Sequence, residues 1–422
     1  MIYNVITHIE IQQVTDYTTS TGAIVARDKC IIIPFLADYE AHSTWEDLTQ
    51  TLKVVLAKNA KYQIKGTDEY IYLGNTTASN SNLGGFDKPP VFMRGDLIAL
   101  RAGYYTQLNG DNDTTQVNDI FSGYISTVSP KLPFTLMCED AMWLCKQIPT
   151  PTKTWAAQSL QSIVKAILGA NTSLEMLTRY AKYGVTLSVS EFNDEGIIFN
   201  VSNIQTLRGS LAMFLDRLKS QYKVDSYFRG SELRVGLTHY VPADNVDHEF
   251  TFQKNIISDG LEWRRRDDMQ MSVIVKSFYN VAGGGSTVDS QTKTKAASTE
   301  ILVYSHKTAT TDGFDYVVKK KGEPFSENDI GERYLYNLYS PITDVKTLFG
   351  MGKEYLKKHY YDGFRGTFTT FGVPFVKHGD TVHIVDNILT ERTGYYKVKS
   401  VTYRGGYDIG LRQDITIDYK IQ

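Results

Sequence analysis

Cysteine is scarce in this chain of 422 residues, which has only Cys30, Cys138 and Cys145. A disulfide framework uses an even and denser set of cysteines, and no two of these three have the short spacing of metal ligands. We therefore expect three small buried side chains in a protein that is synthesised in a reducing compartment.

Long apolar runs are also missing. No window of the sequence approaches the ~20 consecutive apolar residues that a transmembrane helix requires. The N-terminal residues alternate like a strand and lack the basic start and the apolar centre of a signal peptide. The sequence therefore predicts neither membrane insertion nor a secretory leader.

The chain has almost no net charge. It carries 45 Lys and Arg residues against 47 Asp and Glu residues, which gives a formal charge of -2. Such a balance creates no overall field that would attract nucleic acid or an anionic membrane. We expect no specific nucleic-acid binding.

Motifs that carry chemistry are absent as well. The sequence has no GxxxxGK[ST] or GxGxxG loop and no GxSxG nucleophile motif, and its eight histidines are scattered. The carboxylate pairs Glu139-Asp140 and Asp267-Asp268 are adjacent, so on a strand their side chains point to opposite faces. We predict that the protein is not an enzyme and that it binds no cofactor and no metal.

Tyrosine, by contrast, is abundant, with 28 copies. Its apolar ring and polar tip suit β-sheets and subunit interfaces. Alternating segments predict strands over residues 1–40. At 43–60 the apolar period changes, with Trp45, Leu48 and Leu52 on one stripe, and this predicts a helix.

A Gly-Asp pair occurs twice, each time before an alternating stretch. Gly95 and Asp96 open the first copy, Gly379 and Asp380 open the second, and a Gly-Tyr segment follows each copy. Glycine takes turn conformations that other residues avoid, and Asp is favoured beside it in tight turns. We expect these four residues to form equivalent corners of two similar β-barrels.

Between the two copies the pattern changes. Helical periods at 159–169 and 204–222, followed by a hairpin with its turn at Gly230-Ser231, predict a small α/β domain. The expected fold class is α+β, mostly β, with two similar antiparallel β-barrel domains, a small α/β domain between them and a polar insertion. The predicted boundaries are 1–148 for the first barrel with one helix, 149–250 for the α/β domain, 251–280 and 342–422 for the second barrel with one helix, and 281–341 for a polar, partly mobile insertion.

The densest charge run is RRRDD at 264–268. It allows three interpretations: a strand entrance whose opposite charges compensate each other, a subunit interface, or a patch that binds phosphate or DNA. The first is the simplest, because neighbouring acids follow the basic residues directly. Arg264, Arg265 and Arg266 are the candidate subunit-interface residues.

The order of these elements resembles a known family, the central hub proteins of contractile phage-tail baseplates. This is the late control protein D family, which includes the hub half of the type VI secretion spike. The segments that carry the resemblance are VFMRGDLIALRAGYY, DIFSGYISTVSPKLPFTLMCEDAMWLCKQ, SLAMFLDRLKSQYKVDSYFRGSELRVGL and FGVPFVKHGDTVHIVDN followed by TGYYKVKSVTY. Gly372, Pro374, Gly379 and Asp380 match the family's G-x-P-x-x-x-x-G-D strand.

The resemblance implies a structural role. In that family each subunit carries two similar barrels, so that a homotrimer forms a pseudo-sixfold ring, which joins a sixfold tail tube to a threefold spike. The implied partners are the tail tube protein, a separate spike protein and baseplate wedge or sheath-associated proteins. The spike is expected to be a separate chain, because this sequence stops at Gln422 just after the second barrel. The implied location is a virion tail baseplate or injection-system particle, assembled in the bacterial cytoplasm.

Alternatives from other classes stay open at this point. A hub or tip protein of a non-contractile phage tail is a close variant. A β-rich glycan hydrolase would require a deep pocket with two converging carboxylates. A surface adhesin would require exposed aromatic platforms and secretion. The sequence does not say which machine or host is involved, or whether DNA or an effector crosses the channel.

Overall fold

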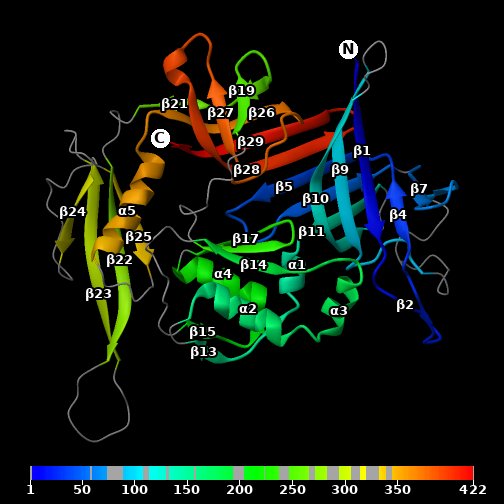
Figure 1. The fold of residues 1–422 in the computed structure, drawn as a ribbon, viewed down its shortest axis with the longest axis horizontal. Helices are drawn as coiled ribbons and strands as arrows, with labels where there is room; N and C mark the ends of the chain where they lie inside the picture. Colours follow the sequence, from blue (N-terminus) through cyan, green and yellow to red (C-terminus); the bar gives the residue numbers. More distant parts are fainter. Residues whose placement is uncertain are drawn as a thin grey trace, which may run out of the picture.

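The computed structural model describes most of the chain in one mostly β-sheet fold (Figure 1). The described residues are 2–57, 59–73, 89–107, 114–129, 133–155, 158–192, 204–222, 224–236, 247–265, 271–282, 294–305, 314–319, 332–338 and 345–421. The fold class is α+β with few helices, as the sequence predicts. No helix among these residues is both long and apolar enough to cross a membrane.

Six strands form what we call the first β-module. They are β1 (Ile2–Gln12), β5 (Asp38–Thr44), β6 (Thr51–Leu56), β9 (Leu97–Gln107), β10 (Thr114–Ser129) and β11 (Phe134–Glu139). Neighbouring strands pair in the order β5–β6–β11–β10–β9–β1, and all of these pairs are antiparallel. The sheet continues beyond β1 through β4 (Cys30–Ile33), β7 (Lys61–Ile64) and β8 (Tyr70–Tyr72), and a short hairpin of β2 (Tyr17–Thr18) and β3 (Ile24–Val25) lies apart from it.

Another six strands form the second β-module. They are β19 (Asp247–Thr251), β20 (Ile256–Asp259), β26 (Gly363–Phe371), β27 (Thr381–Val385), β28 (Gly394–Gly406) and β29 (Gly410–Ile421). Their pairing order is β20–β26–β29–β28–β27–β19. Strand β21 (Glu262–Arg264) continues the line of β20 along β26, and a 3-10 turn, η4 (Thr390–Arg392), precedes β28.

The two modules share one connection pattern. Numbered along the chain, each set of six strands pairs in the order second, third, sixth, fifth, fourth, first. One difference stands out: β1 is antiparallel to β9, whereas β19 is parallel to β27. Six strands arranged the same way twice in one chain form a structural repeat.

The modules are not two separate barrels. Strand β28 pairs with β5 from Ser400↔Thr44 to Gly406↔Asp38, so both modules belong to one continuous 16-stranded sheet among the described residues. Their side chains also share one hydrophobic core, with Leu100 from the first module and Phe368 from the second both fully buried. We call the β28–β5 pairing the seam.

A small helical domain lies below this sheet in Figure 1. Its helices are α1 (Met142–Cys145) at the end of β11, α2 (Leu160–Ala170), α3 (Glu175–Ala181) and α4 (Leu211–Tyr222). Its strands are β12 (Pro149–Thr150), β13 (Lys153–Trp155), β14 (Ser188–Phe192), β15 (Ile204–Thr206), β16 (Gly209–Ser210), β17 (Asp225–Arg229) and β18 (Glu232–Gly236). The predicted hairpin is present, because β17 and β18 meet at Gly230, whose φ is +65°. We call residues 142–236 the middle domain.

A separate four-stranded sheet stands at the left of Figure 1, in the order β24–β23–β22–β25. Its strands are β22 (Met271–Ala282), β23 (Thr294–Ser305), β24 (Phe314–Lys319) and β25 (Glu332–Leu338), and helix α5 (Val345–His359) packs against it. The sequence predicts α5 as a helix but expects both α5 and β22 in the second barrel, whereas β22 pairs within this sheet and α5 packs on it. The predicted mobility of 281–341 falls largely on 283–293, 306–313 and 320–331, outside the described residues.

The helix that the sequence predicts at 43–60 does not exist. Residues 38–44 and 51–56 are instead the neighbouring strands β5 and β6. In β6 the side chains of Leu52, Val54 and Leu56 are buried and alternate with more exposed ones, which is a strand period. The helical stripe arose because two short strands and their connecting loop placed apolar residues at helix-like spacing.

Candidate functional site

The first Gly-Asp pair forms a sharp corner at the start of β9. Gly95 has a φ of +93°, a conformation in which a side chain would be strained. Its N–H donates to the carbonyl of Ile125 at 2.8 Å, and the Ile125 N–H donates back to the carbonyl of Asp96 at 2.9 Å. The Asp96 carboxylate also accepts the N–H of Met93 at 2.8 Å, which closes the turn before the corner.

The second pair repeats this geometry at the start of β27. Gly379 has a φ of +83°, and its N–H donates to the carbonyl of Val398 at 2.8 Å. The Val398 N–H returns to the carbonyl of Asp380 at 3.0 Å, and the Asp380 carboxylate accepts the N–H of Lys377 at 2.8 Å. The four predicted corner residues therefore occupy matching positions, with the same hydrogen bonds.

The structure also changes how the two repeats align. In both modules the ladder to the next strand shifts directly after the corner partner, between Ile125 and Thr127 and between Val398 and Ser400. This alignment makes Gly123 equivalent to Tyr396, so the Gly-Tyr segments seen in the sequence are two residues out of register. Because side chains alternate along a strand, a shift of two residues keeps the same face.

Each corner aspartate is paired with an arginine from a distant part of the chain. Asp96 accepts two hydrogen bonds from Arg27, at 3.0 and 2.8 Å, and both side chains are almost completely buried. Asp380 accepts one from Arg229 at 2.9 Å, and His248 Nε2 lies 3.4 Å from its other oxygen. Burial alone would raise the pKa of Asp380, but His248, the Lys377 N–H and Arg229 together hold it below its usual value.

Both corners hold the middle domain. At the first corner, Tyr180 of α3 donates its buried hydroxyl to the carbonyl of Gly95 at 2.7 Å. Its ring lies edge-on to Tyr124, which stacks on Trp143 with 5.1 Å between centroids. At the second corner the contact is Arg229, at the end of β17. The two corners are therefore sites of contact between the sheet and the middle domain.

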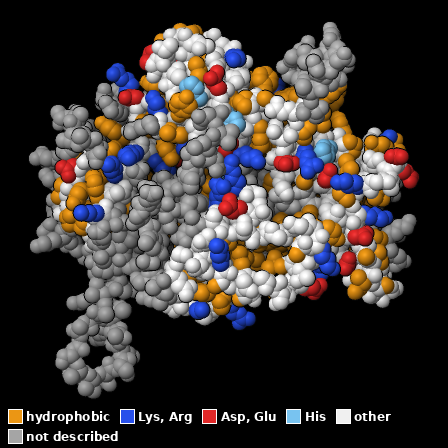
Figure 2. Space-filling model, in the orientation of Figure 1, with side chains coloured by type: hydrophobic (Ala, Val, Ile, Leu, Met, Phe, Trp, Pro, Cys, Tyr) orange, Lys and Arg blue, Asp and Glu red, His pale blue; other side chains and the backbone are white. Residues whose placement is uncertain are grey.

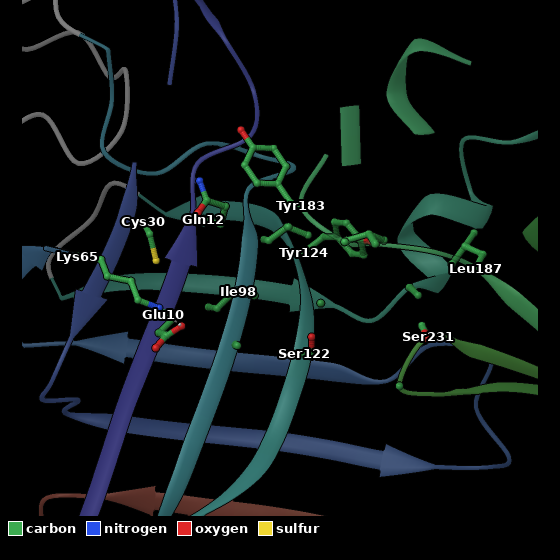
Figure 3. A pocket seen from close by; sticks show the side chains of 17 residues that line it. Glu10, Gln12, Cys30, Lys65, Ile98, Ser122, Tyr124, Tyr183, Leu187 and Ser231 are labelled. Carbon is green, nitrogen blue, oxygen red and sulfur yellow. Dashed lines mark ion pairs between the residues drawn. The ribbon is translucent and has the colours of Figure 1, made fainter. Parts of the chain in front are cut away.

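A cavity of about 510 Å³ lies beside the first corner (Figure 3). Strands β1, β9 and β10 form one wall, and the loop after α3 and the β17–β18 turn face it. In Figure 3, Lys65 points toward Glu10, and Lys65 Nζ lies 3.6 Å from Glu10 Oε2. Burial raises the pKa of the nearby Cys30 thiol, and Lys65 only partly offsets this. That thiol is not activated as a nucleophile.

A second cavity, of about 340 Å³, lies where both modules meet the middle domain. A hydrogen-bond relay spans this junction. Gln50 donates to the carbonyl of Phe228 at 2.5 Å and accepts from Ser43 at 3.3 Å, while Ser43 Oγ lies 2.5 Å from His378 Nδ1. Burial, followed by Arg229, lowers the pKa of His378 to about 3, so the imidazole is neutral. The relay connects β5, β17 and the second corner.

Two carboxylates, Asp119 and Asp140, line this junction cavity. Burial raises the pKa of Asp140 to about 7, while the N–H groups of Gln50 and Met142 lower it in part. Those two N–H groups donate to its oxygens at 3.2 and 3.0 Å, so Asp140 caps the turn into α1. Asp119 forms a solvent-exposed ion pair with Arg101 at 2.8 Å. These contacts give both carboxylates a structural role.

The candidate interface arginines lie away from the corners. Arg264 ends β21, its side chain is 50% exposed, and it pairs with Glu262 at 3.1 Å. Arg265 is exposed beside it, and Arg266 lies outside the described residues. Figure 2 shows Lys and Arg side chains gathered near the middle of one face, with acidic side chains beside them.

No sequence pattern pointed to the residues that complete the corners. Arg27 is 69 residues from Asp96, and Arg229 is 151 residues from Asp380. Tyr180 resembled one of the many tyrosines in the chain. No local spacing rule connects such distant positions, so only the folded chain identifies these partners.

Comparison with known proteins identifies the type of fold. No protein-family model matches the chain, and no curated protein matches it significantly. A tail protein from Neisseria meningitidis has a similar structure, with a TM-score of 0.52 and 11% identity, over 99% of this chain and 96% of that one. A 43 kDa prophage tail protein from Shewanella oneidensis gives 0.48 at 12% identity over 99% and 98% of the chains. An Escherichia coli component of the type VI secretion system gives 0.46 at 6% identity over 98% and 77%. The chain therefore has a phage-tail-like fold.

Proposed function

We propose that this chain is the structural hub of a contractile tail or injection-machine baseplate. Three copies would form a ring with six β-modules, which joins a sixfold tail tube to a separate threefold spike. The observation that carries the proposal is the repeat: one chain holds two modules with the same strand order and the same Gly-Asp corners. The phage-tail-like fold supports it independently.

The physical argument is one of symmetry. A sixfold partner presents six equivalent surfaces, and a threefold partner presents three. A trimer whose subunits each carry two similar modules offers six similar positions on one side and three distinct ones on the other. The corners support this role because they connect both modules to one middle domain, through Tyr180 at the first corner and Arg229 at the second.

Mass photometry of the purified chain tests the proposal. We expect a species at about three times 47.7 kDa, and two-dimensional averages in electron microscopy should show a ring with six lobes. A strict monomer at every soluble concentration would contradict the trimer. A trimer with only three lobes would leave the oligomer intact but remove the proposed match to a sixfold tube.

A further inference from the structure

The seam inside the chain shows how one module joins another. It is an antiparallel ladder in which Ser400 of β28 pairs with Thr44 of β5. The backbone pairing is tight, and Thr44 is only 3% exposed. Side chains reinforce it, because His42 Nδ1 lies 3.0 Å from Thr402 Oγ1 and Lys399 forms an ion pair with Glu46 at 2.8 Å.

The repeat identifies the equivalent of each seam strand in the other module. Strand β10 corresponds to β28, because each holds the corner partner and then shifts register. The equivalence can be followed from strand to strand across each module. In the first module Leu52 of β6 pairs with Ala41 of β5, and the position of Leu52 in the second module is Gly366 of β26. Residue 261 lies opposite Gly366, so it corresponds to Ala41. Strand β21 therefore corresponds to the second half of β5, with Arg264 at the position of Thr44 and Thr127 at the position of Ser400.

These two equivalent strands have no seam within the chain. Among the described strands, the end of β10 from Thr127 to Ser129 pairs only with β11, and β21 pairs only with β26. Thr127 is exposed, and the side chains of Glu262 and Arg264 are 70% and 50% exposed. An open strand edge is a ready surface for pairing with another chain.

We propose that a second copy of this chain closes both edges by repeating the seam between subunits. Strand β21 of one copy would pair antiparallel with the end of β10 of the next, with Arg264 opposite Thr127 and Glu262 opposite Ser129. This inference rests on the proposed ring, since the step from module to module must continue across the subunit boundary for three copies to close. It gives the predicted interface arginines Arg264 and Arg265 a definite place.

Disulfide trapping tests this register. In a Cys30→Ser background, the pair Thr127→Cys and Arg264→Cys should cross-link under mild oxidation into covalent dimers and trimers on a denaturing gel. The matched control, Thr127→Cys with Glu262→Cys, is two residues out of register, where strand neighbours lie roughly 7 Å apart. It should cross-link several-fold more slowly, and neither single-cysteine variant should form a ladder.

Hydrogen exchange on the unmodified protein gives a second measurement. Within 127–129 and 262–264, the amides that face the open edge should become protected when a dilute sample is concentrated into the trimer, whereas those that face β11 and β26 should not change. A trimer without that protection, and without preferential cross-linking of the predicted pair, would overturn the proposed pairing of β21 with β10 between subunits. The proposed ring would remain. A protein that stays monomeric would overturn both, and the exposed charges Glu262 and Arg264 of β21 would then serve only to keep an edge strand soluble.

Discussion

At the scale of single residues, the two corner aspartates do similar work in different surroundings. Asp96 and Arg27 are both nearly inaccessible, whereas the side chain of Arg229 beside Asp380 is 22% exposed. Removing one member of a buried pair leaves the other charge without water or an opposite charge, and Arg27 would keep only hydrogen bonds to the carbonyls of Thr15, Pro90 and Val91. The first corner should therefore be the less tolerant of the two.

We predict that Asp96→Ala lowers the free energy of unfolding by about 3–5 kcal/mol, because it leaves the buried charge of Arg27 without its carboxylate. Asp380→Ala should cost less, since water can reach Arg229. Asp119→Ala is the matched control: its exposed pair with Arg101 should contribute at most ~1 kcal/mol. Urea unfolding of the three variants measures the order, and equal losses in all three would contradict it.

The sequence identified only half of each corner. Gly95, Asp96, Gly379 and Asp380 could be found because adjacent residues form a visible motif. Their arginine partners and the relay from Gln50 to His378 could not, because those contacts depend on which distant segments the fold brings together. The same reasoning left Arg264 with three interpretations, a strand entrance among them, and could not tell that this strand lies at an edge.

At the scale of elements, helix α5 shows a glycine that serves packing. A Cβ on Gly352 would lie 2.6 Å from Val303 Cγ2 and 2.9 Å from Val275 Cγ2, so the helix sits directly on β22 and β23 there. A Cβ on Gly350, two residues earlier, would meet nothing within 4 Å. One glycine is needed for close approach, and the other only weakens the helix.

We therefore expect opposite effects from two alanine substitutions in one helix. Gly350→Ala should stabilise the protein by up to ~1 kcal/mol through helix propensity. Gly352→Ala gains the same propensity but overpacks the sheet contact, so a net loss of about 1–2 kcal/mol is expected. Thermal unfolding followed by circular dichroism compares the two, and stabilisation by both would show that the contact at Val303 yields easily.

Element prediction succeeded where one period was long and failed where two short elements imitated it. The period of α4 runs through Leu211, Leu215 and Leu218, all fully buried. Residues 43–60 instead combine the end of β5, a loop and β6, and their apolar spacing resembles a helix by coincidence. Sequence periodicity cannot separate these cases without knowing the strand partners.

At the scale of the whole molecule, the seam is what makes two modules one body. Strand β28 carries Gly405 against the ring of Tyr39 on β5, and a Cβ there would lie 2.3 Å from Tyr39 Cζ. The Tyr39 ring is 1% exposed, so it cannot move outward into solvent without leaving the core. The sequence predicted two modules but not their union, because the paired segments lie more than 350 residues apart.

We predict that Gly405→Ala loosens this union. We expect one calorimetric transition for the wild type and, for Gly405→Ala, a lower Tm with a broadened or divided transition, because the modules no longer unfold together. Tyr407→Ala, in the turn just after β28 where the side chain is 80% exposed, should leave the transition unchanged. An unaltered transition in Gly405→Ala would mean that the seam does not couple the modules.

The opposite direction of β19 relative to β1 has a consequence for any larger assembly. Because that outer strand runs parallel to its neighbour in one module and antiparallel in the other, the modules match in their hydrogen-bonded centre and differ at that strand. In the proposed ring of three chains, the six modules would then alternate between two kinds. A sixfold partner that contacts only the shared centre would meet six similar surfaces. A threefold partner that contacts β19 would meet three identical ones.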